Sequence, residues 1–217
     1  MMLLPVAIVM IGWLRGTQAF AVAPRPPDGD YASPTGWDVA YSTGREAADW
    51  LLPYDAIRDE LLTSLAGLEE DPILECGCGT SPLASRLVAD GFRKVVACDA
   101  SRVAIEAASS LFGEVAGLSF VHADARSLKA FPDGAFAAVI DKGTLDAICS
   151  GEGFDFEGGR VARALCRVLR PTGRWLCVSL MPPQVVLPMM RRDGEWALEH
   201  QRLGDGLHLY RGLRATV

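Results

Sequence analysis

A short apolar stretch, residues 73–74, leads directly into Glu75 and then into two glycines one residue apart, Gly77 and Gly79. This order predicts a buried strand that turns sharply at its end. Glycine suits such a turn because a Cβ would block either the turn itself or the close approach of a ligand to the backbone. The chain is therefore expected to contain a strand–loop–helix unit with a ligand at the loop, and a turn without a ligand is the alternative.

The loop differs from the dinucleotide fingerprint G-x-G-x-x-G, because Pro82 stands at the position of the third glycine. The carboxylate beside the loop also repels phosphate and attracts an amine or hydroxyls. Both features favour a ligand with a cation and a ribose, and S-adenosylmethionine (SAM) fits this better than NAD. We expect Glu75, Gly77, Cys78 and Gly79 to contact the cofactor.

Three further apolar runs end in an acidic residue, at Asp99, Asp124 and Asp141. Asp99 lies 20 residues beyond Gly79, where a βαβ unit presents a carboxylate to ribose hydroxyls. We expect Asp124 to accept a hydrogen bond from the exocyclic amine of adenine. Ligands of open α/β folds bind at the carboxyl edge of the sheet, where all these acids would meet. Each Asp could instead cap a helix.

The alternation of apolar runs with amphipathic segments predicts an α/β fold. We expect a Rossmann-like, mostly parallel seven-strand sheet with helices on both faces and a C-terminal antiparallel hairpin. The expected helices cover 55–65, 83–90, 102–111 and 160–169. The expected strands end at the four acids above and then cover 174–180, 196–203 and 207–215.

Composition limits the partners. At 217 residues and 50% hydrophobic content, the chain is long enough for one domain with a substantial core. The formal charge of −6 disfavours nucleic acid, which requires a basic surface, and is compatible with a basic protein or peptide substrate. The six cysteines include Cys76-x-Cys78, which lacks the spacing of zinc or redox sites. We therefore expect free thiols and no metal.

The N-terminus predicts a leader. The apolar run 3–14 is too short to cross a bilayer of about 30 Å, so no stable membrane span is expected. Residues 1–19 suggest a signal or targeting segment, and 20–36 a flexible linker or transit segment. The start of the latter resembles plastid transit sequences of algae with secondary plastids, which implies a plastid location. A cytoplasmic protein, a signal anchor and a misassigned start are the alternatives.

The folded domain is expected over 37–217, and its first part is aromatic. Trp37, Tyr41 and Trp50 fall within a short segment before the first long helix. At the carboxyl edge of the sheet they would form a lid that excludes water from a sulfonium, and cation–π attraction could contribute on the order of 1 kcal/mol. Packing over the sheet without contact to a ligand is the alternative.

Two segments after the fourth strand point to the acceptor. Residues 142–147 predict a strand-to-helix turn that carries both charges beside the methyl position. Residues 150–159 are rich in glycine and acid, which is typical of a flexible substrate loop or of an ordinary solvated loop.

The glycine loop, Asp99, Asp124 and the segment 167–173 resemble successive motifs of class I, seven-strand SAM-dependent methyltransferases. A narrower likeness rests on 37–41, on 78–81 and above all on Asp-Lys-Gly-Thr-Leu-Asp-Ala at 141–147. These segments resemble the methyltransferase-like group that methylates lysines, and in one case the N-terminus, of translation elongation factor 1-alpha. The resemblance implies a protein substrate, such as a translation factor, and SAM contacts from Trp37, Tyr41, Trp50, Gly77, Asp99, Ala100, Asp124, Ala125 and Lys142.

Methyl transfer is an in-line displacement, so alignment and desolvation supply most of the acceleration. A lysine acceptor must first lose its proton, and a desolvated pocket lowers its pKa from the ordinary value of about 10.4. The catalytic candidates near the acceptor are Asp141, Lys142 and Asp146, with Trp50 as the pocket wall. Asp141-Lys142-Gly143 replaces the Asn/Asp-Pro-Pro-aromatic signature of base-amine methyltransferases. A small-molecule methyltransferase and a non-catalytic SAM-fold binding module are the alternatives.

Overall fold

The computed structural model describes residues 31–43, 49–204 and 206–215. The predicted targeting segment 1–19 and residues 20–30 of the predicted linker or transit segment lie outside these ranges. Among the described residues, no helix has the length and apolar character that a membrane crossing requires.

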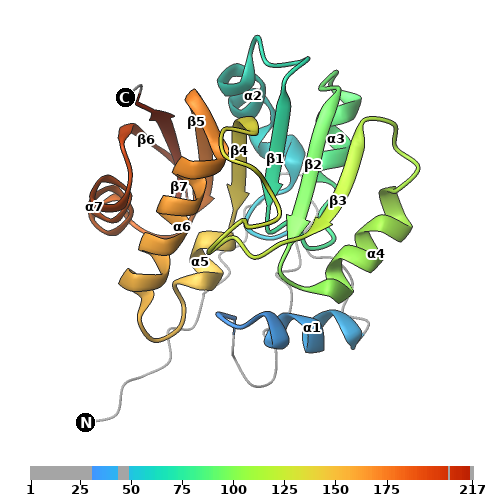
Figure 1. Cartoon of the computed structure of the whole chain (residues 1–217), viewed down its shortest axis with the longest axis horizontal. Coiled ribbons are helices and arrows are strands. Elements are labelled where there is room, and N and C mark those ends of the chain that lie inside the picture. Colours follow the sequence, from blue (N-terminus) through green and yellow to red (C-terminus); the bar gives the residue numbers. More distant parts are fainter. Residues whose placement is uncertain (1–30, 44–48, 205, 216–217) are drawn as a thin grey trace, which may run out of the picture.

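Seven strands form one sheet in the order β3-β2-β1-β4-β5-β7-β6 (Figure 1). The first five run parallel, whereas β7 is antiparallel to both β5 and β6. The predicted Rossmann-like sheet with a C-terminal hairpin is therefore confirmed. The strands are β1 (Pro72–Cys76), β2 (Lys94–Asp99), β3 (Leu118–His122), β4 (Phe136–Lys142), β5 (Leu169–Ser179), β6 (Trp196–Gly204) and β7 (Leu207–Arg214).

The strand order reverses between β1 and β4, which pair directly through Cys76 and Asp141. Chain connections leave these two strands toward opposite sides of the sheet. A crevice forms outside the carboxyl ends of strands at such a switch point, and this is where open α/β sheets bind ligands. The topology alone therefore directs attention to the loops after β1 and β4.

Helices cover both faces of the sheet (Figure 1). Successive side chains of a strand point to opposite faces, so Ile73 of β1 joins the core under one helical layer and Leu74 the core under the other. Full burial of one such side chain stabilises the fold by about 1.5–3 kcal/mol. One layer holds α2 (Tyr54–Leu65), α3 (Leu83–Ala89) and α4 (Arg102–Phe112), and the other α5 (Thr144–Ile148), α6 (Phe154–Val168) and α7 (Pro183–Asp193).

The helix α1 (Pro34–Ser42) lies across the carboxyl edge of the sheet (Figure 1). Ser33 is its N-cap, because its hydroxyl accepts a hydrogen bond from the Gly36 N–H at 3.4 Å. The helix thus begins inside the segment predicted to be a linker. All six cysteines are free, as predicted.

The prediction of a flexible loop over 150–159 is wrong for most of its length, because α6 begins at Phe154. Asp155 and Glu157 lie in the first turn of this helix, where carboxylates interact favourably with the helix dipole. A Cβ on Gly158 would collide with Met189 of α7. The acids and glycines that suggested a mobile loop therefore serve helix initiation and close helix packing.

Candidate cofactor and acceptor site

A cavity of about 790 Å³ lies between the carboxyl ends of the parallel strands and α1, within the range of about 300–1,000 Å³ typical of small-molecule sites. Every residue predicted to bind the cofactor lines it. Of the predicted catalytic residues, Lys142 and Asp146 line it, whereas Asp141 does not. The cofactor candidates that the structure brings together here are Trp37, Tyr41, Trp50, Glu75, Gly77, Cys78, Gly79, Asp99, Ala100, Asp124, Ala125 and Lys142.

The glycine loop forms the floor of the cavity. The N–H groups of Gly77 and Cys78 both donate to the Cys98 carbonyl, at 2.7 and 2.9 Å. Gly77 and Gly79 have φ angles of +71° and +52°, a region that side chains with a Cβ rarely adopt. A Cβ would also collide with Thr144 at the first glycine and with the Tyr41 hydroxyl at the second. Both glycines are therefore required by backbone conformation and by space.

Asp99 lies beside this loop at the end of β2. Its carboxylate accepts hydrogen bonds from the N–H groups of Gly79 and Ser101, each at 2.8 Å. Burial raises the pKa of this carboxyl, and the two N–H donors oppose that shift. A carboxylate has about four acceptor positions, so two remain for hydroxyl groups of a ligand. The predicted ribose site is therefore geometrically available.

Glu75 lies under the loop at the N-terminus of α3. Its Oε2 atom accepts a hydrogen bond from the Ala84 N–H at 3.1 Å. Burial raises the pKa of Glu75 to about 8, although the nearby Lys142 ammonium opposes the shift. The folded protein therefore favours the protonated form of this carboxyl more than water does.

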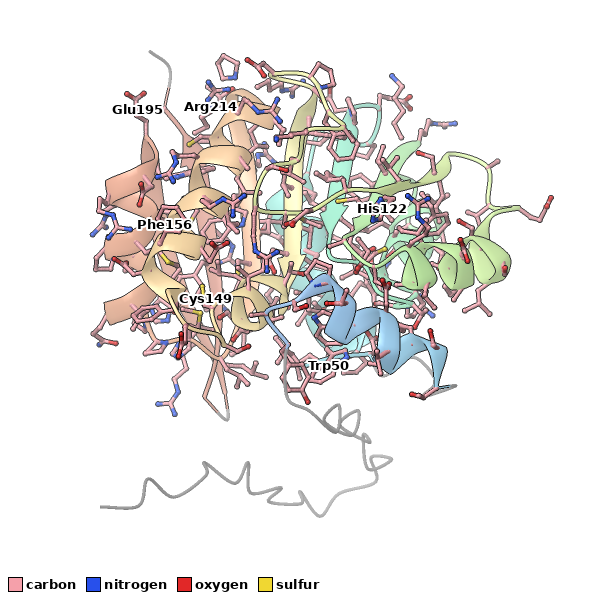
Figure 2. The ribbon with its side chains drawn as sticks, turned by 60° about the horizontal axis from the view of Figure 1, so that its bottom comes forward. Trp50, His122, Cys149, Phe156, Glu195 and Arg214 are labelled. Atoms are coloured by element: carbon pink, nitrogen blue, oxygen red, sulfur yellow. The ribbon has the colours of Figure 1, made fainter. Side chains whose placement is uncertain are left out.

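Four aromatic side chains form the roof: Tyr31, Trp37, Tyr41 and Trp50. The Trp37 ring is 5.9 Å from Tyr41 in a stacked arrangement and 5.7 Å from Trp50 in an edge arrangement, both measured between ring centroids. Trp50 lies beside α1 (Figure 2). The position over the cavity is the one that the lid prediction requires.

Lys142 connects the roof to the sheet. Its Nζ atom donates to Asp49 Oδ1 at 2.8 Å and to the Trp50 carbonyl at 2.6 Å. Asp49 also accepts from the Ser81 hydroxyl at 2.9 Å. Sequence reasoning missed Asp49, because a single acid in a segment without periodicity carries no signal of its own.

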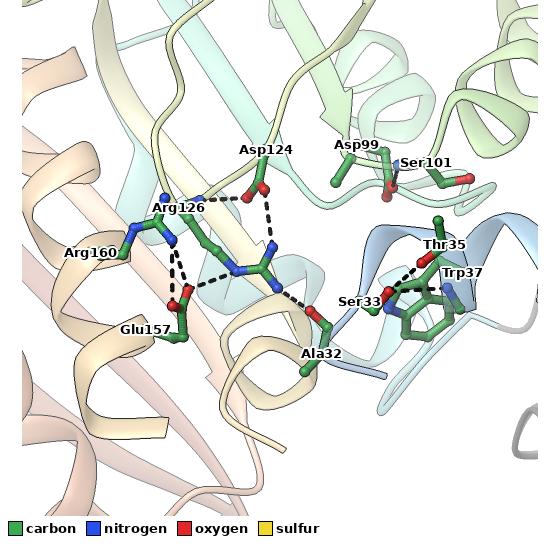
Figure 3. A network of polar contacts seen from close by, with 12 residues as sticks. Ala32, Ser33, Thr35, Trp37, Asp99, Ser101, Asp124, Arg126, Glu157 and Arg160 are labelled. Atoms are coloured by element: carbon green, nitrogen blue, oxygen red, sulfur yellow. Dashed lines mark hydrogen bonds and ion pairs between the residues drawn. The ribbon is translucent and has the colours of Figure 1, made fainter. Parts of the chain in front are cut away.

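Arg126 forms a second connection, shown in Figure 3. Asp124 accepts from the Arg126 N–H at 2.8 Å and from its Nη1 at 3.0 Å, while the guanidinium also donates to the Ala32 carbonyl and pairs with Glu157. The loop after β3 is thereby joined to the segment before α1 and to α6. Sequence reasoning missed this arginine, since its role depends on contacts far along the chain.

Asp141 has a different position from the one predicted. Its carboxylate is buried and accepts hydrogen bonds from the N–H groups of Thr144 and Leu145, the first two residues of α5. Burial raises its pKa to about 7. The geometry therefore assigns Asp141 to capping α5, the alternative reading of strand-end acids, and gives no support to direct contact with an acceptor.

Asp146 and Thr80 each have a buried side-chain oxygen and line the cavity. Asp146 Oδ1 accepts from the Leu180 N–H at 2.8 Å. Burial raises the pKa of the Asp146 carboxyl, and a hydrogen bond from the Ser179 hydroxyl opposes this shift. Asp146 Oδ2 and Thr80 Oγ1 have no hydrogen bond of normal geometry among the described residues, and both side chains line the cavity, so these oxygens can accept hydrogen bonds from a ligand.

The residues present fit SAM. Asp99 can bind a diol, the glycine loop gives a close approach to backbone, and the aromatic roof suits a sulfonium, which cation–π contact stabilises by about 0.5–2 kcal/mol. Glu75 places an acidic group beside the glycine loop, and such a group does not suit the phosphates of a dinucleotide. A family model described as "Methyltransferase domain" matches residues 73–173, the segment that contains the glycine loop and all four strand-end acids.

Two curated proteins align with most of the chain. EEF1A lysine methyltransferase 4 of Bos taurus is 31% identical over 185 residues, covering 80% of this chain and 71% of the relative. Citrate synthase-lysine N-methyltransferase, mitochondrial, of Homo sapiens is 32% identical over 191 residues, covering 77% and 79%.

Among solved structures, an S-adenosylmethionine dependent methyltransferase from Mesorhizobium loti superposes with a TM-score of 0.59. The two are 15% identical, and the match covers 73% of this chain and 98% of that one. At this identity the likeness shows the fold alone.

Proposed function

This chain belongs to the SAM-dependent methyltransferase family, and we propose that it methylates the ε-amine of a lysine in a protein. SAM supplies an activated methyl group. The remaining question is which acceptor the cavity of this chain selects. The observation that supports an amine most strongly is the Asp146 carboxyl in the wall of the cavity.

Asp146 lies on the α5 side of the cavity, close to Leu180 at the end of β5. An amine or ammonium placed at Oδ2 would give this oxygen the hydrogen bond of normal geometry that it lacks among the described residues. A hydrogen bond to an ionised partner contributes about 1.5–3 kcal/mol, more than a bond between neutral groups. Asp146 therefore favours a nitrogen acceptor that carries hydrogens.

The rim around Asp146 suits the rest of a lysine side chain. Ile148 is buried, and Leu180 is 44% exposed although it is apolar and lines the cavity. Trp50 lies on the roof side. Lysine keeps its charged end in a polar site while its methylene groups pack on apolar surface. The partly exposed Leu180 places the entrance at the protein surface, where a large acceptor can approach.

In the reaction, a new N–C bond forms as the S–C bond to the methyl group breaks, and the cofactor product is a neutral thioether. The nitrogen must first lose a proton, because only its lone pair can attack. Desolvation by the apolar rim lowers the pKa of the amine, whereas the Asp146 carboxylate orients it and can accept the proton or pass it to water. Orientation and exclusion of water supply most of the acceleration.

We propose a protein rather than a small molecule as the acceptor. The relatives described above are named for lysine methylation of EEF1A and of citrate synthase. A translation factor is our first candidate, because several EEF1A methyltransferases align with the chain.

Incubation of the full chain with tritiated SAM and a cell extract tests the proposal. We expect tritium in one or few protein bands, and methyl-lysine after acid hydrolysis. Asp146→Asn should lower the rate of labelling at least about tenfold, since a bond to a charged group is lost, while SAM affinity stays within about twofold.

Label found solely in the small-molecule fraction would replace the protein acceptor by a metabolite. Absence of any transfer, with SAM bound normally, would favour a binding module. Wild-type rates in Asp146→Asn would remove this residue from the acceptor site.

A further inference from the structure

A second, shallower groove of about 410 Å³ runs along α6. It is lined by one aromatic and four cationic side chains: Phe156, Arg126, Arg160, Arg163 and Arg167. On α6 the spacing of 156, 160, 163 and 167 places these residues on one face of the helix, along three turns. Among the described residues that line the groove none is acidic, although each arginine has an acidic partner beside the groove.

The groove presents groups that could bind a partner. Phe156 is 66% exposed and projects from α6 (Figure 2). The side chains of Arg160 and Arg163 are 39% and 52% exposed. Within the described part of the chain, each of these two arginines donates through Nη1 alone. A guanidinium has five N–H donors, so most remain for a ligand carboxylate.

The arginines already have acidic neighbours, and these neighbours do not block the groove. Arg163 pairs with Asp193 of α7, Arg160 with Glu157, and Arg167 with Asp133, whose side chain is almost wholly exposed. The Arg167–Asp133 pair lies at an exposed surface and contributes little to stability, since water screens it. Asp193 and Glu157 are mostly buried, so carboxylates of a partner would share the free N–H donors of Arg163 and Arg160 with these acids and would not replace them.

The groove adjoins the cofactor cavity at Arg126. Arg126 lines both, and its side chain is only 13% exposed because it lies between them. Ser150, on the rim of the cavity, precedes Phe156 by only six residues. A chain segment bound along α6 thus lies next to the cavity in which the methyl acceptor is expected.

We propose that this groove binds an acidic segment of the protein substrate, with carboxylates on Arg160 and Arg163 and an apolar side chain on Phe156. The inference rests on the proposed function and adds a docking site remote from the reacting atoms. A peptide fits better than a nucleic acid, because the groove is short and its arginines lie beside an exposed phenylalanine that an apolar side chain of a peptide can contact.

Fluorescence anisotropy with the full chain tests the groove without any need for methyl transfer. The probe is a fluorescein-labelled peptide in which glutamates flank two central leucines, and a labelled single-stranded RNA of similar charge is the comparison. We expect the peptide to bind more tightly than the RNA, and its affinity to fall as salt rises. Arg160→Glu/Arg163→Glu should weaken peptide binding at least about tenfold, and Phe156→Ala several-fold.

Arg93→Glu/Lys94→Glu is the matched control, because it changes the net charge equally at two exposed positions at the opposite, amino end of β2. This control should bind the peptide nearly as well as the wild type. Arg160→Lys/Arg163→Lys keeps the charge and should retain most of the affinity, and SAM affinity in every variant shows that the domain is folded.

No peptide binding by the wild type, equal losses in the groove and control variants, or tighter binding of RNA would each overturn the proposal. Peptide binding that depends on the groove, together with no methyl transfer into any protein, would support the groove and contradict the proposed function. The two ideas can thus fail separately.

Discussion

Acidic residues at the ends of neighbouring parallel strands share one sequence pattern, yet their carboxylates accept hydrogen bonds from different parts of the chain. Asp99 binds the glycine loop and leaves acceptor positions open, Asp141 caps α5, and Glu75 is buried at the start of α3. The difference follows from which backbone N–H groups each carboxylate meets. At the residue scale, position along the edge decides between cofactor binding and helix capping.

Glu75 should make the stability of the cofactor-free protein depend on pH. Its pKa is about 8 in the folded protein against an ordinary 4.5, so the folded state retains a proton that the unfolded state loses. Stability should therefore fall as pH rises from about 4.5 to about 8. Urea unfolding at several pH values should show this slope, and Glu75→Gln should make it shallower.

Asp141 titrates in the same direction, with a folded pKa of about 7, so part of the slope should remain in Glu75→Gln. An identical slope in the wild type and in Glu75→Gln would show that Glu75 is not the group responsible.

At the scale of helices and strands, the predicted and the observed structures differ mainly in where helices begin and end. The core of the fold was predictable, because the apolar runs, the glycine turn and the terminal hairpin are local patterns. The start of α6 was not, since Gly158 is explained by Met189 of α7, which is distant in sequence. The helix α7 was missed as well, and Pro188 inside it weakens its helical pattern.

In the candidate site, too, local sequence patterns predicted some residues and missed those that act through distant partners. Residues of the glycine loop and of the roof were found from local motifs, and they line one cavity. Asp49 and Arg126 were missed because each acts through a partner far along the chain, Lys142 for the first and the Ala32 carbonyl for the second. Local patterns carry no information about such pairs.

Removal of the α5 cap should destabilise the protein without stopping catalysis outright. Asp141→Ala leaves the N–H groups of Thr144 and Leu145 without their acceptor, and loss of such a cap costs about 0.5–2 kcal/mol. Asp141→Asn keeps one carboxamide oxygen and should lose less. Urea denaturation measures both values, and tritium transfer should persist in Asp141→Asn. Complete loss of transfer in that variant, with normal stability and SAM affinity, would mean that Asp141 acts on the acceptor after all.

At the scale of the whole molecule, the described residues form one seven-strand sheet covered by helices, and the candidate site lies at its carboxyl edge, between the sheet and α1 (Figure 1). Low-identity structural neighbours establish its fold, whereas the relatives of 31–32% identity establish its family. We expect the acceptor to be selected at Asp146 and along α6. Both lie outside the glycine loop and within residues 73–173, which the family model matches.

Calorimetric titration of SAM into the full chain tests the central claim, that this cavity binds the cofactor through Asp99. We predict one site per chain, and an affinity at least about tenfold weaker in Asp99→Ala, because bonds from hydroxyls to a charged group are lost. Circular dichroism should show that the variant is folded. Absence of SAM binding by the wild type, or unchanged affinity in folded Asp99→Ala, would contradict the site described here.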